Sequence, residues 1–353
     1  MKTHAIIPIF IPHRGCPNDC VFCNQRVITA RQAHVGPEDV TRTIEAYLPT
    51  LQGRNLKTIE VAFFGGSFTG ISLEEQSLLL KTAKKYKDQG WIDKIHLSTR
   101  PDYIDERILD NLKNHGADII ELGVQSFDPA VLAASNRGHD VQDIYRACHL
   151  IKEYGFTLGI QLMIGLPEDS PEKCLSSAHE TVKMAPAIAR LYPVVVLKGT
   201  ALSRMYQAGS YRPLSTDEAV ATTKEMYRIL DAAGINIIRV GLKSTDLIAE
   251  GGEIQGHTFH PAFRQLVEGE IAKEQLERQL TELLCPEKLS AAEAAASPQV
   301  PVFVFSSSSK SFSNLIGNAK RNKKYFAEKY PGIEIIYRTN SFLADGQYTV
   351  VKC

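Results

Sequence analysis

Residues 5–23 read AIIPIFIPHRGCPNDCVFC, a short apolar run followed at once by three cysteines. The run at residues 5–11 is short, Pro8 and Pro12 break the apolar stretch, and it leads directly into the cysteines, so it predicts a buried β-strand and not a signal peptide. Cys16, Cys20 and Cys23 follow with the spacing CxxxCxxC. Because active sites gather where parallel strands end, this stretch predicts a metal or cofactor loop at the end of a first strand.

Apolar runs alternate with amphipathic stretches from this point to about residue 240. Further strands are predicted at 58–64, 94–98, 118–124, 157–164, 190–197 and 235–240. Helices are predicted between them at 37–52, 72–89, 104–115, 140–154, 171–184 and 215–233. A strand followed by a helix, repeated several times, indicates parallel βαβ units. This periodicity fits both a doubly wound α/β sheet and a complete or partial (β/α) barrel.

The pattern weakens after residue 245, which divides the chain into a core at 1–245 and an extension at 246–353. In the extension we expect a helix at 261–284 and an Ala/Ser-rich linker at 289–299. The last part predicts a small α/β unit, with strands at 300–305, 333–338 and 347–352 and a helix at 312–329.

The composition is that of a soluble globular protein, with 353 residues, 44% hydrophobic and 23% charged, and no formal net charge. No stretch approaches the roughly 20 apolar residues that span a bilayer. We therefore expect a cytoplasmic protein without a membrane partner. Seven cysteines, three of them clustered, do not fit the disulfide framework of a secreted domain.

Three clustered thiols indicate an iron–sulfur site, because cysteine is the usual ligand of such clusters and three ligands leave one iron open. A structural zinc site needs four ligands, so zinc would require His13 or a distant residue as well. A loop of free thiols is the other alternative.

Residues 8–25 (PIFIPHRGCPNDCVFCNQ) resemble the cluster loop of radical S-adenosylmethionine (SAM) proteins related to the Elongator catalytic subunit. The oxygen-independent coproporphyrinogen oxidase-like group is a wider relative, and the resemblance covers most of residues 5–240. It implies a partial (β/α)6 TIM-like barrel of the radical SAM type, in which Cys16, Cys20 and Cys23 hold a [4Fe-4S] cluster. It also implies that SAM binds the open iron and is cleaved by one electron to methionine and a 5′-deoxyadenosyl radical.

The resemblance also implies the SAM contacts. The turn at 65–67 would bind the amino group, Gln125 the ribose, and Arg137 the carboxylate, while the strand segment with Gln161 and Met163 would cradle the adenosine. Relatives usually carry Glu at the place of Ser98, so a water molecule or Glu121, on the same face as Gln125, would compensate. The predicted cofactor-binding residues are Phe22, Gly65, Gly66, Ser67, Ser98, Glu121, Gln125, Arg137, Gln161 and Met163.

The segment 310–329 holds six Lys or Arg residues against one acid. It would bind tRNA phosphates, with Tyr325 or Phe326 stacking on bases, or it is an ordinary solvated helix face. No glycine-rich loop of the acetyl-CoA type follows residue 240. We therefore expect a radical SAM enzyme, reduced by a reductase or by flavodoxin or ferredoxin, with a tRNA base as substrate. The alternatives are a small porphyrin- or cofactor-pathway substrate, and an Fe–S binding or sensor protein without turnover.

Overall fold

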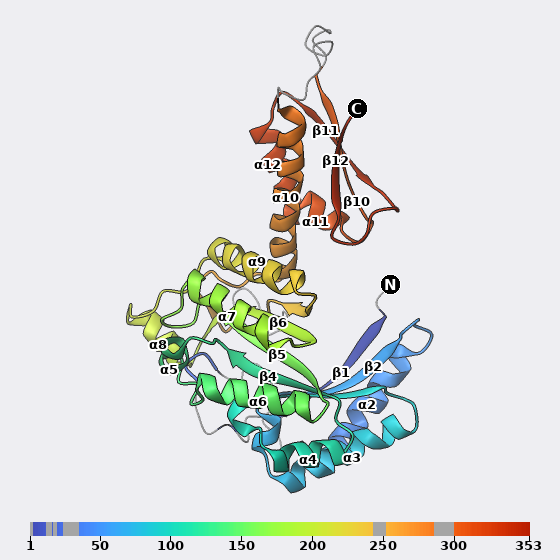
Figure 1. Ribbon diagram of the computed structural model, residues 1–353, viewed down its shortest axis with the longest axis vertical. Coiled ribbons are helices and arrows are strands. Elements are labelled where there is room, and N and C mark those ends of the chain that lie inside the picture. Colours follow the sequence, from blue (N-terminus) through green and yellow to red (C-terminus); the bar gives the residue numbers. More distant parts are fainter. Residues whose placement is uncertain (1–2, 12–15, 17–19, 24–34, 243–251, 286–299) are drawn as a thin grey trace. The chain divides into compact units, whose positions relative to one another are not determined.

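The computed structural model describes the chain except residues 1–2, 12–15, 17–19, 24–34, 243–251 and 286–299 (Figure 1). Two compact units are present, at residues 1–261 and 262–353. The predicted boundary between residues 245 and 246 lies outside the described residues, and so do the predicted linker at 289–299 and His13.

A seven-stranded parallel sheet forms the centre of the first unit. Its strands are β1 (His4–Ile11), β2 (Thr58–Gly65), β3 (Lys94–Thr99), β4 (Ile119–Gln125), β5 (Thr157–Ile164), β6 (Ile188–Pro193) and β8 (Asn236–Val240). They follow one another in the sheet in the order β1-β2-β3-β4-β5-β6-β8. A doubly wound sheet would reverse its order at a switch point, whereas here each strand adds on the same side. The sheet is therefore a curled, partial barrel, as the resemblance implied.

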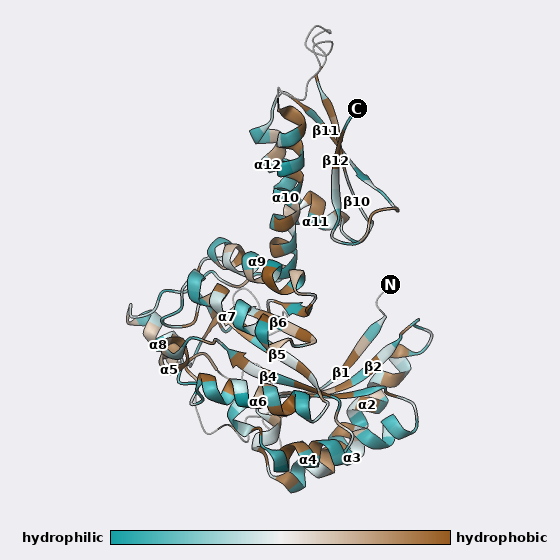
Figure 2. Cartoon of the chain, in the orientation of Figure 1, coloured by the Kyte–Doolittle hydropathy of each residue, from teal (hydrophilic) through white to brown (hydrophobic). Residues whose placement is uncertain are grey.

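Helices cover one face of this sheet, because right-handed crossovers that always advance in the same direction place every helix on the same side. They are α2 (Pro37–Leu51), α3 (Leu73–Asp88), α4 (Glu106–Asn114), α6 (Val141–Glu153), α7 (Pro171–Met184) and α9 (Thr216–Ala232), with the short α5 (Pro129–Ala134) and α8 (Ala201–Gln207). Figure 2 shows hydrophobic and hydrophilic residues on each of α3, α4 and α6. In the described part of the chain, no helix is long and apolar enough to cross a membrane.

The two faces of the strands differ in chemistry. On β4, Ile120, Leu122 and Val124 are fully buried, whereas Glu121 and Gln125 alternate with them on the other face. The apolar side chains form the core under the helices. The concave face therefore carries the polar residues from which a site can be built.

The prediction of one continuous strand at 190–197 is wrong, because the segment forms two separate strands. β6 ends at Pro193, the N–H of Val194 donates to the carbonyl of Ile164 (2.9 Å), and the chain then leaves the sheet. β7 (Val196–Leu197) pairs antiparallel with β9 (Ile254–Gln255) instead of with the main sheet.

In the second unit, α10 (Phe263–Leu284) packs on a three-stranded sheet of β10 (Val302–Ser307), β11 (Glu334–Thr339) and β12 (Tyr348–Lys352). The predicted single helix at 312–329 is wrong. Gly317, with φ at 77°, breaks it into α11 (Phe312–Ile316) and α12 (Arg321–Lys329), joined by a 3-10 turn at residues 318–320. The Asn322 amide donates to the carbonyl of Asn314 (3.0 Å), which satisfies a carbonyl that the broken helix leaves open.

Candidate active site

Most of the predicted site residues come from segments at or beyond the carboxyl ends of β1 to β5, while Glu121 and Gln161 lie within β4 and β5. The cysteine loop follows β1, Gly65 ends β2, and Gln125 ends β4. Arg137 lies between α5 and α6, and Gln161 and Met163 lie on β5. The parallel sheet therefore gathers at one edge residues that are up to 147 positions apart in the chain, from Cys16 to Met163 (163 − 16 = 147).

The described part of the cysteine loop is held from both sides. The N–H of Val21 donates to the carbonyl of Ser135 (3.1 Å), and the carbonyl of Val21 accepts from the N–H of Leu202 (2.7 Å). Cys20 is buried, while Cys16 and Cys23 are half-buried. The side chains of Phe22 and Met163 pack against the same apolar cluster, which includes Val21 and Leu202. The two hydrogen bonds anchor the backbone at Val21, the residue next to Cys20.

Arg137 contacts the cysteine loop directly. Its Nη1 donates to Cys20 Sγ (3.1 Å), and its Nη2 donates to the carbonyl of Gly123 (2.5 Å). A Cβ at Gly123 would lie 3.0 Å from Gln125 Nε2 and 3.6 Å from Arg137 Nη2, so a side chain at this position would press on Gln125 and lie beside Arg137. A guanidinium beside a thiolate stabilises its negative charge.

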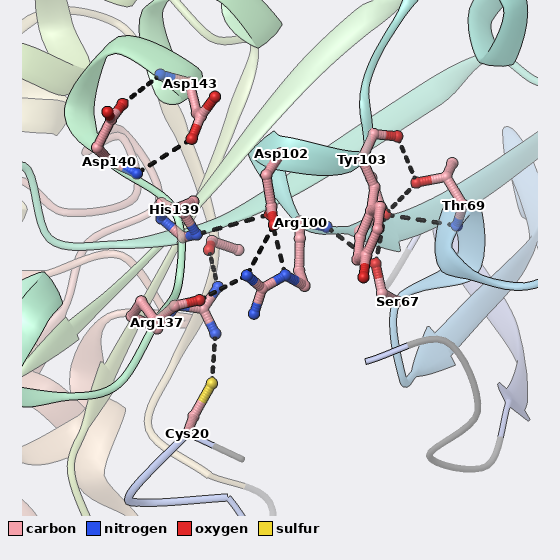
Figure 3. A network of polar contacts seen from close by, with 12 residues as sticks. Cys20, Ser67, Thr69, Arg100, Asp102, Tyr103, Arg137, His139, Asp140 and Asp143 are labelled. Carbon is pink, nitrogen blue, oxygen red and sulfur yellow. Dashed lines mark hydrogen bonds and ion pairs between the residues drawn. The ribbon is translucent and has the colours of Figure 1, made fainter. Parts of the chain in front are cut away.

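A second buried arginine lies beside the first, and sequence reasoning missed it. Arg100 Nε and Nη2 each donate to one carboxylate oxygen of Asp102 (both 2.9 Å), and Nη2 also donates to the Arg137 carbonyl (2.5 Å) (Figure 3). Burial lowers the pKa of Arg100, but the hydrogen bonds and charge of Asp102, together with the charges of Cys20 and Cys16, more than offset burial and leave that pKa raised. The signal was present in the sequence, since Thr99-Arg100-Pro101-Asp102 follows the predicted third strand as directly as the glycine turn follows the second.

His139 lies close to both arginines. Its Nδ1 is 3.9 Å from Asp102 Oδ1, and its side chain is buried. Burial and the positive charge of Arg137 lower the pKa of His139 to about 4, although Asp102 acts in the opposite direction. The imidazole is therefore neutral at pH 7 and adds no positive charge to the pair of guanidinium groups.

Three hydroxyl groups link the ends of β2 and β3. Thr99 Oγ1 lies 2.8 Å from Ser67 Oγ and 2.5 Å from Thr69 Oγ1. Ser67 Oγ also accepts from the backbone N–H of Arg100 (3.3 Å). Burial raises the pKa of the Cys16 thiol, while a hydrogen bond from the Ser67 backbone and the charge of Arg100 oppose that rise. Ser67 thus connects the glycine turn to both the cysteine loop and Arg100.

The predicted adenosine-binding residues meet on the concave face. Gln161 Nε2 donates to Gln125 Oε1 (3.1 Å). Gln125 has φ at 71°, a left-handed conformation that is strained for a residue with a side chain, and it follows a bulge in β4. Strain of this kind collects at ligand sites because the surrounding structure enforces it.

Ser98 and Glu121 are brought together as the sequence suggested, but Glu121 has another partner. Ser98 Oγ donates to Glu121 Oε1 (3.2 Å), while Arg190 Nε lies 2.7 Å from Glu121 Oε2. His96 lies between two carboxylates, with Nδ1 3.4 Å from Glu60 and Nε2 3.8 Å from Glu121. Sequence reasoning missed His96, Glu60 and Arg190, because each is a single polar residue inside an apolar strand.

These residues fit a [4Fe-4S] cluster and SAM in their chemistry. Three thiols on one loop are the ligand type that such a cluster takes, and two buried guanidinium groups carry the positive charge that suits thiolates and a carboxylate. In the described part of the chain, no three His, Cys, Asp or Glu side chains form a ready-made metal group. The thiols therefore share one loop without converging on one point.

Comparisons with known proteins agree with this chemistry. The chain matches the Radical SAM superfamily over residues 10–180 and the Radical SAM C-terminal domain over residues 186–273. It is 27% identical over 254 residues to a tRNA uridine(34) acetyltransferase of Methanocaldococcus jannaschii, covering 61% of this chain and 47% of that protein. It is 28% identical over 252 residues to Elongator complex protein 3 of Homo sapiens, covering 59% and 46%.

The chain thus spans about half the length of the curated relatives it matches. Among solved structures, the archaeal Methanocaldococcus infernus Elp3 with an N-terminal deletion is similar in fold, with a TM-score of 0.62 and 21% identity over 78% of this chain and 64% of that one. The chain therefore belongs to the radical SAM superfamily, whose enzymes use a [4Fe-4S] cluster together with S-adenosylmethionine.

Proposed function

We propose that Cys16, Cys20 and Cys23 hold the [4Fe-4S] cluster and that the chain is a SAM-cleaving enzyme acting on a tRNA base. The observation that carries the first part is the contact of Arg137 with Cys20 at the edge where the glycine turn and Gln125 also lie. When bound, the cluster and SAM supply a 5′-deoxyadenosyl radical, which removes a hydrogen atom from the substrate.

The residues of this chain bind and orient the cofactors. In the proposal, the turn at 65–67 receives the amino group of SAM, Arg137 pairs with its carboxylate, and Gln125 and Gln161 bind the ribose. Phe22 and Met163 supply apolar contact, since they pack on the same cluster of side chains. The polar network around Glu121 and Ser98 lies on the concave face, and we propose that it contacts SAM or substrate.

A tRNA substrate is supported by the similarity to a tRNA uridine(34) acetyltransferase and by a basic surface on the second unit. Two cations of the segment 310–329 are neutralised, since Lys310 pairs with Asp345 and Lys329 with Glu277. The other four are exposed on or next to the first turns of α12: Lys320, Arg321, Lys323 and Lys324. We propose that this basic surface contacts phosphates.

The two aromatic residues beside this basic surface differ in their exposure. Phe326 is fully buried, which corrects the expectation that it would stack. Tyr325 is half-buried, and its hydroxyl donates to Glu277 (2.7 Å).

The test of cofactor use is anaerobic reconstitution with iron and sulfide, followed by addition of SAM and dithionite. We expect 5′-deoxyadenosine from the wild type and none from Cys20→Ala. Cys285→Ala removes an exposed thiol far along the chain and is the matched control, which should retain activity. Zinc at the loop, or cleavage that survives Cys20→Ala, would refute the cluster assignment.

The test of substrate is binding of bulk tRNA at several salt concentrations. Neutralising Lys320, Lys323 and Lys324 with glutamine should weaken binding and reduce its salt dependence. Lys57→Gln and Lys113→Gln, which lie in the first unit, are the control. A small-molecule substrate is favoured instead if tRNA does not bind and a deletion strain keeps all its modified nucleosides.

A further inference from the structure

Arg100 has one nitrogen without a role in the contacts described above. Nε and Nη2 donate to Asp102 and to the Arg137 carbonyl, while Nη1 is buried and donates to no acceptor among the described residues. Only 4% of Arg100 is exposed. A buried donor on a charged group is costly to leave unsatisfied, so this position requires an acceptor.

The direction of this donor points to the cysteine loop. In Figure 3 the free nitrogen of Arg100 is directed away from Asp102, toward the side on which Arg137 and Cys20 lie. The negative charges of Cys20 and Cys16 both act on the guanidinium and favour its charged form. Arg100 therefore lies within electrostatic reach of two of the three proposed ligands.

We propose that the Nη1–H of Arg100 donates a hydrogen bond to a sulfur of the cluster and that Arg100 thereby raises the reduction potential of the cluster. This inference rests on the proposed [4Fe-4S] site at Cys16, Cys20 and Cys23. Reduction adds one electron, taken from a low-potential donor such as reduced flavodoxin or ferredoxin, and so makes the cluster more negative. A fixed cation in a low-dielectric site stabilises the more negative form, and hydrogen bonds to the sulfurs act in the same direction.

Changes at Asp102 and at Arg100 should shift the reduction potential of the cluster in opposite directions. Its carboxylate holds Arg100 in place through two hydrogen bonds, and it carries the opposite charge. Removing the positive charge should lower the potential, whereas removing the negative charge should raise it. A purely structural role of the pair would move the potential of both variants in the same direction or not at all.

The experiment is a potentiometric titration of the anaerobically reconstituted full chain without SAM, using dithionite and viologen mediators and following the EPR signal of the reduced cluster. We expect a lower midpoint potential for Arg100→Gln, a higher one for Asp102→Asn and no change for Arg146→Gln. Arg146 is the matched control because it is an exposed arginine that also pairs with an aspartate, Asp143. Equal potentials for wild type, Arg100→Gln and Asp102→Asn, or shifts of the same sign, would overturn the inference.

Further variants and measurements of SAM affinity distinguish other roles of Arg100. If Arg100→Gln does not take up a cluster, Arg100→Lys and Asp102→Asn still decide, because the first keeps the charge and should stay near the wild-type potential. If Arg100→Gln keeps its potential but loses affinity for SAM and not for decarboxylated SAM, the donor serves the carboxylate and the cluster inference is wrong. Failure of the proposed function differs from these results, since the wild type itself would then show no [4Fe-4S] signal.

Discussion

Replacing Glu121 with glutamine removes the negative charge that balances Arg190 on the concave face of the sheet. Glu121 Oε2 lies 2.7 Å from Arg190 Nε, and the two side chains are 2% and 11% exposed. Removing one partner of a buried ion pair costs about 3–5 kcal/mol, because the other charge stays buried without compensation. The Arg190 guanidinium also lies 4.6 Å from the centre of the Phe64 ring, a contact that glutamine leaves in place. We therefore expect a loss near the lower limit, about 3 kcal/mol.

The assay is urea unfolding followed by tryptophan fluorescence. Trp91 is the single tryptophan of the chain and belongs to the first unit, so the signal reports on the unit that holds the ion pair. Asp88→Asn is the control, because Asp88 pairs with Lys84 on the surface, with side chains 59% and 37% exposed. An exposed pair of this kind contributes about 0–1 kcal/mol.

A double variant separates the ion pair from other effects of the substitution. In Glu121→Gln with Arg190→Met, no uncompensated charge remains, so the double variant should be more stable than the sum of the single losses predicts, by about 2 kcal/mol or more. A loss below about 1 kcal/mol for Glu121→Gln, or simple additivity, would refute the reasoning.

Three further predictions concern single positions. The wild type should lose about 3 kcal/mol of stability between pH 6.5 and pH 4, because a pKa of about 4 keeps native His139 neutral while the unfolded imidazole takes up a proton. His139→Gln should lose less over the same range, as measured by urea unfolding at several pH values. Gly123→Ala places a Cβ 3.0 Å from Gln125 Nε2 and should weaken SAM binding about tenfold by equilibrium dialysis, and unchanged affinity would contradict the proposed ribose contact. Gly317→Ala, at φ 77°, should destabilise the second unit by about 1–2 kcal/mol, seen as faster hydrogen exchange in α11 and α12 with no change in the first unit.

Hydrophobic periodicity was sufficient to predict the strands of the main sheet and the helices that cover it. Strands buried in the sheet give apolar runs, and helices that bury one face give amphipathic stretches. The predicted helix at 72–89 is α3, and Ser72 Oγ accepts from the Glu75 N–H (3.2 Å), which is the N-cap half of the predicted capping box. The order of the strands was not contained in the periodicity. It followed only from the family resemblance, and the structure confirms a partial barrel.

Sequence reasoning failed where one residue changes the backbone or where polar residues meet across strands. Gly317 breaks the predicted helix at 312–329, although the flanking residues have helical periodicity. Arg100 and Arg190 are each a lone cation in the sequence, and their roles depend on partners brought near by the sheet. Such pairs cannot be read from spacing along one strand.

The sheet ends at β1, which pairs with β2 and is its first strand. An end strand presents backbone groups with which another chain can form hydrogen bonds, and this is a common route to aggregation. Pro8 lies in the middle of β1 and has no N–H to donate. Pro8 therefore interrupts the row of N–H donors with which another strand would pair. A single proline thus disfavours intermolecular strand pairing at the open edge of the barrel.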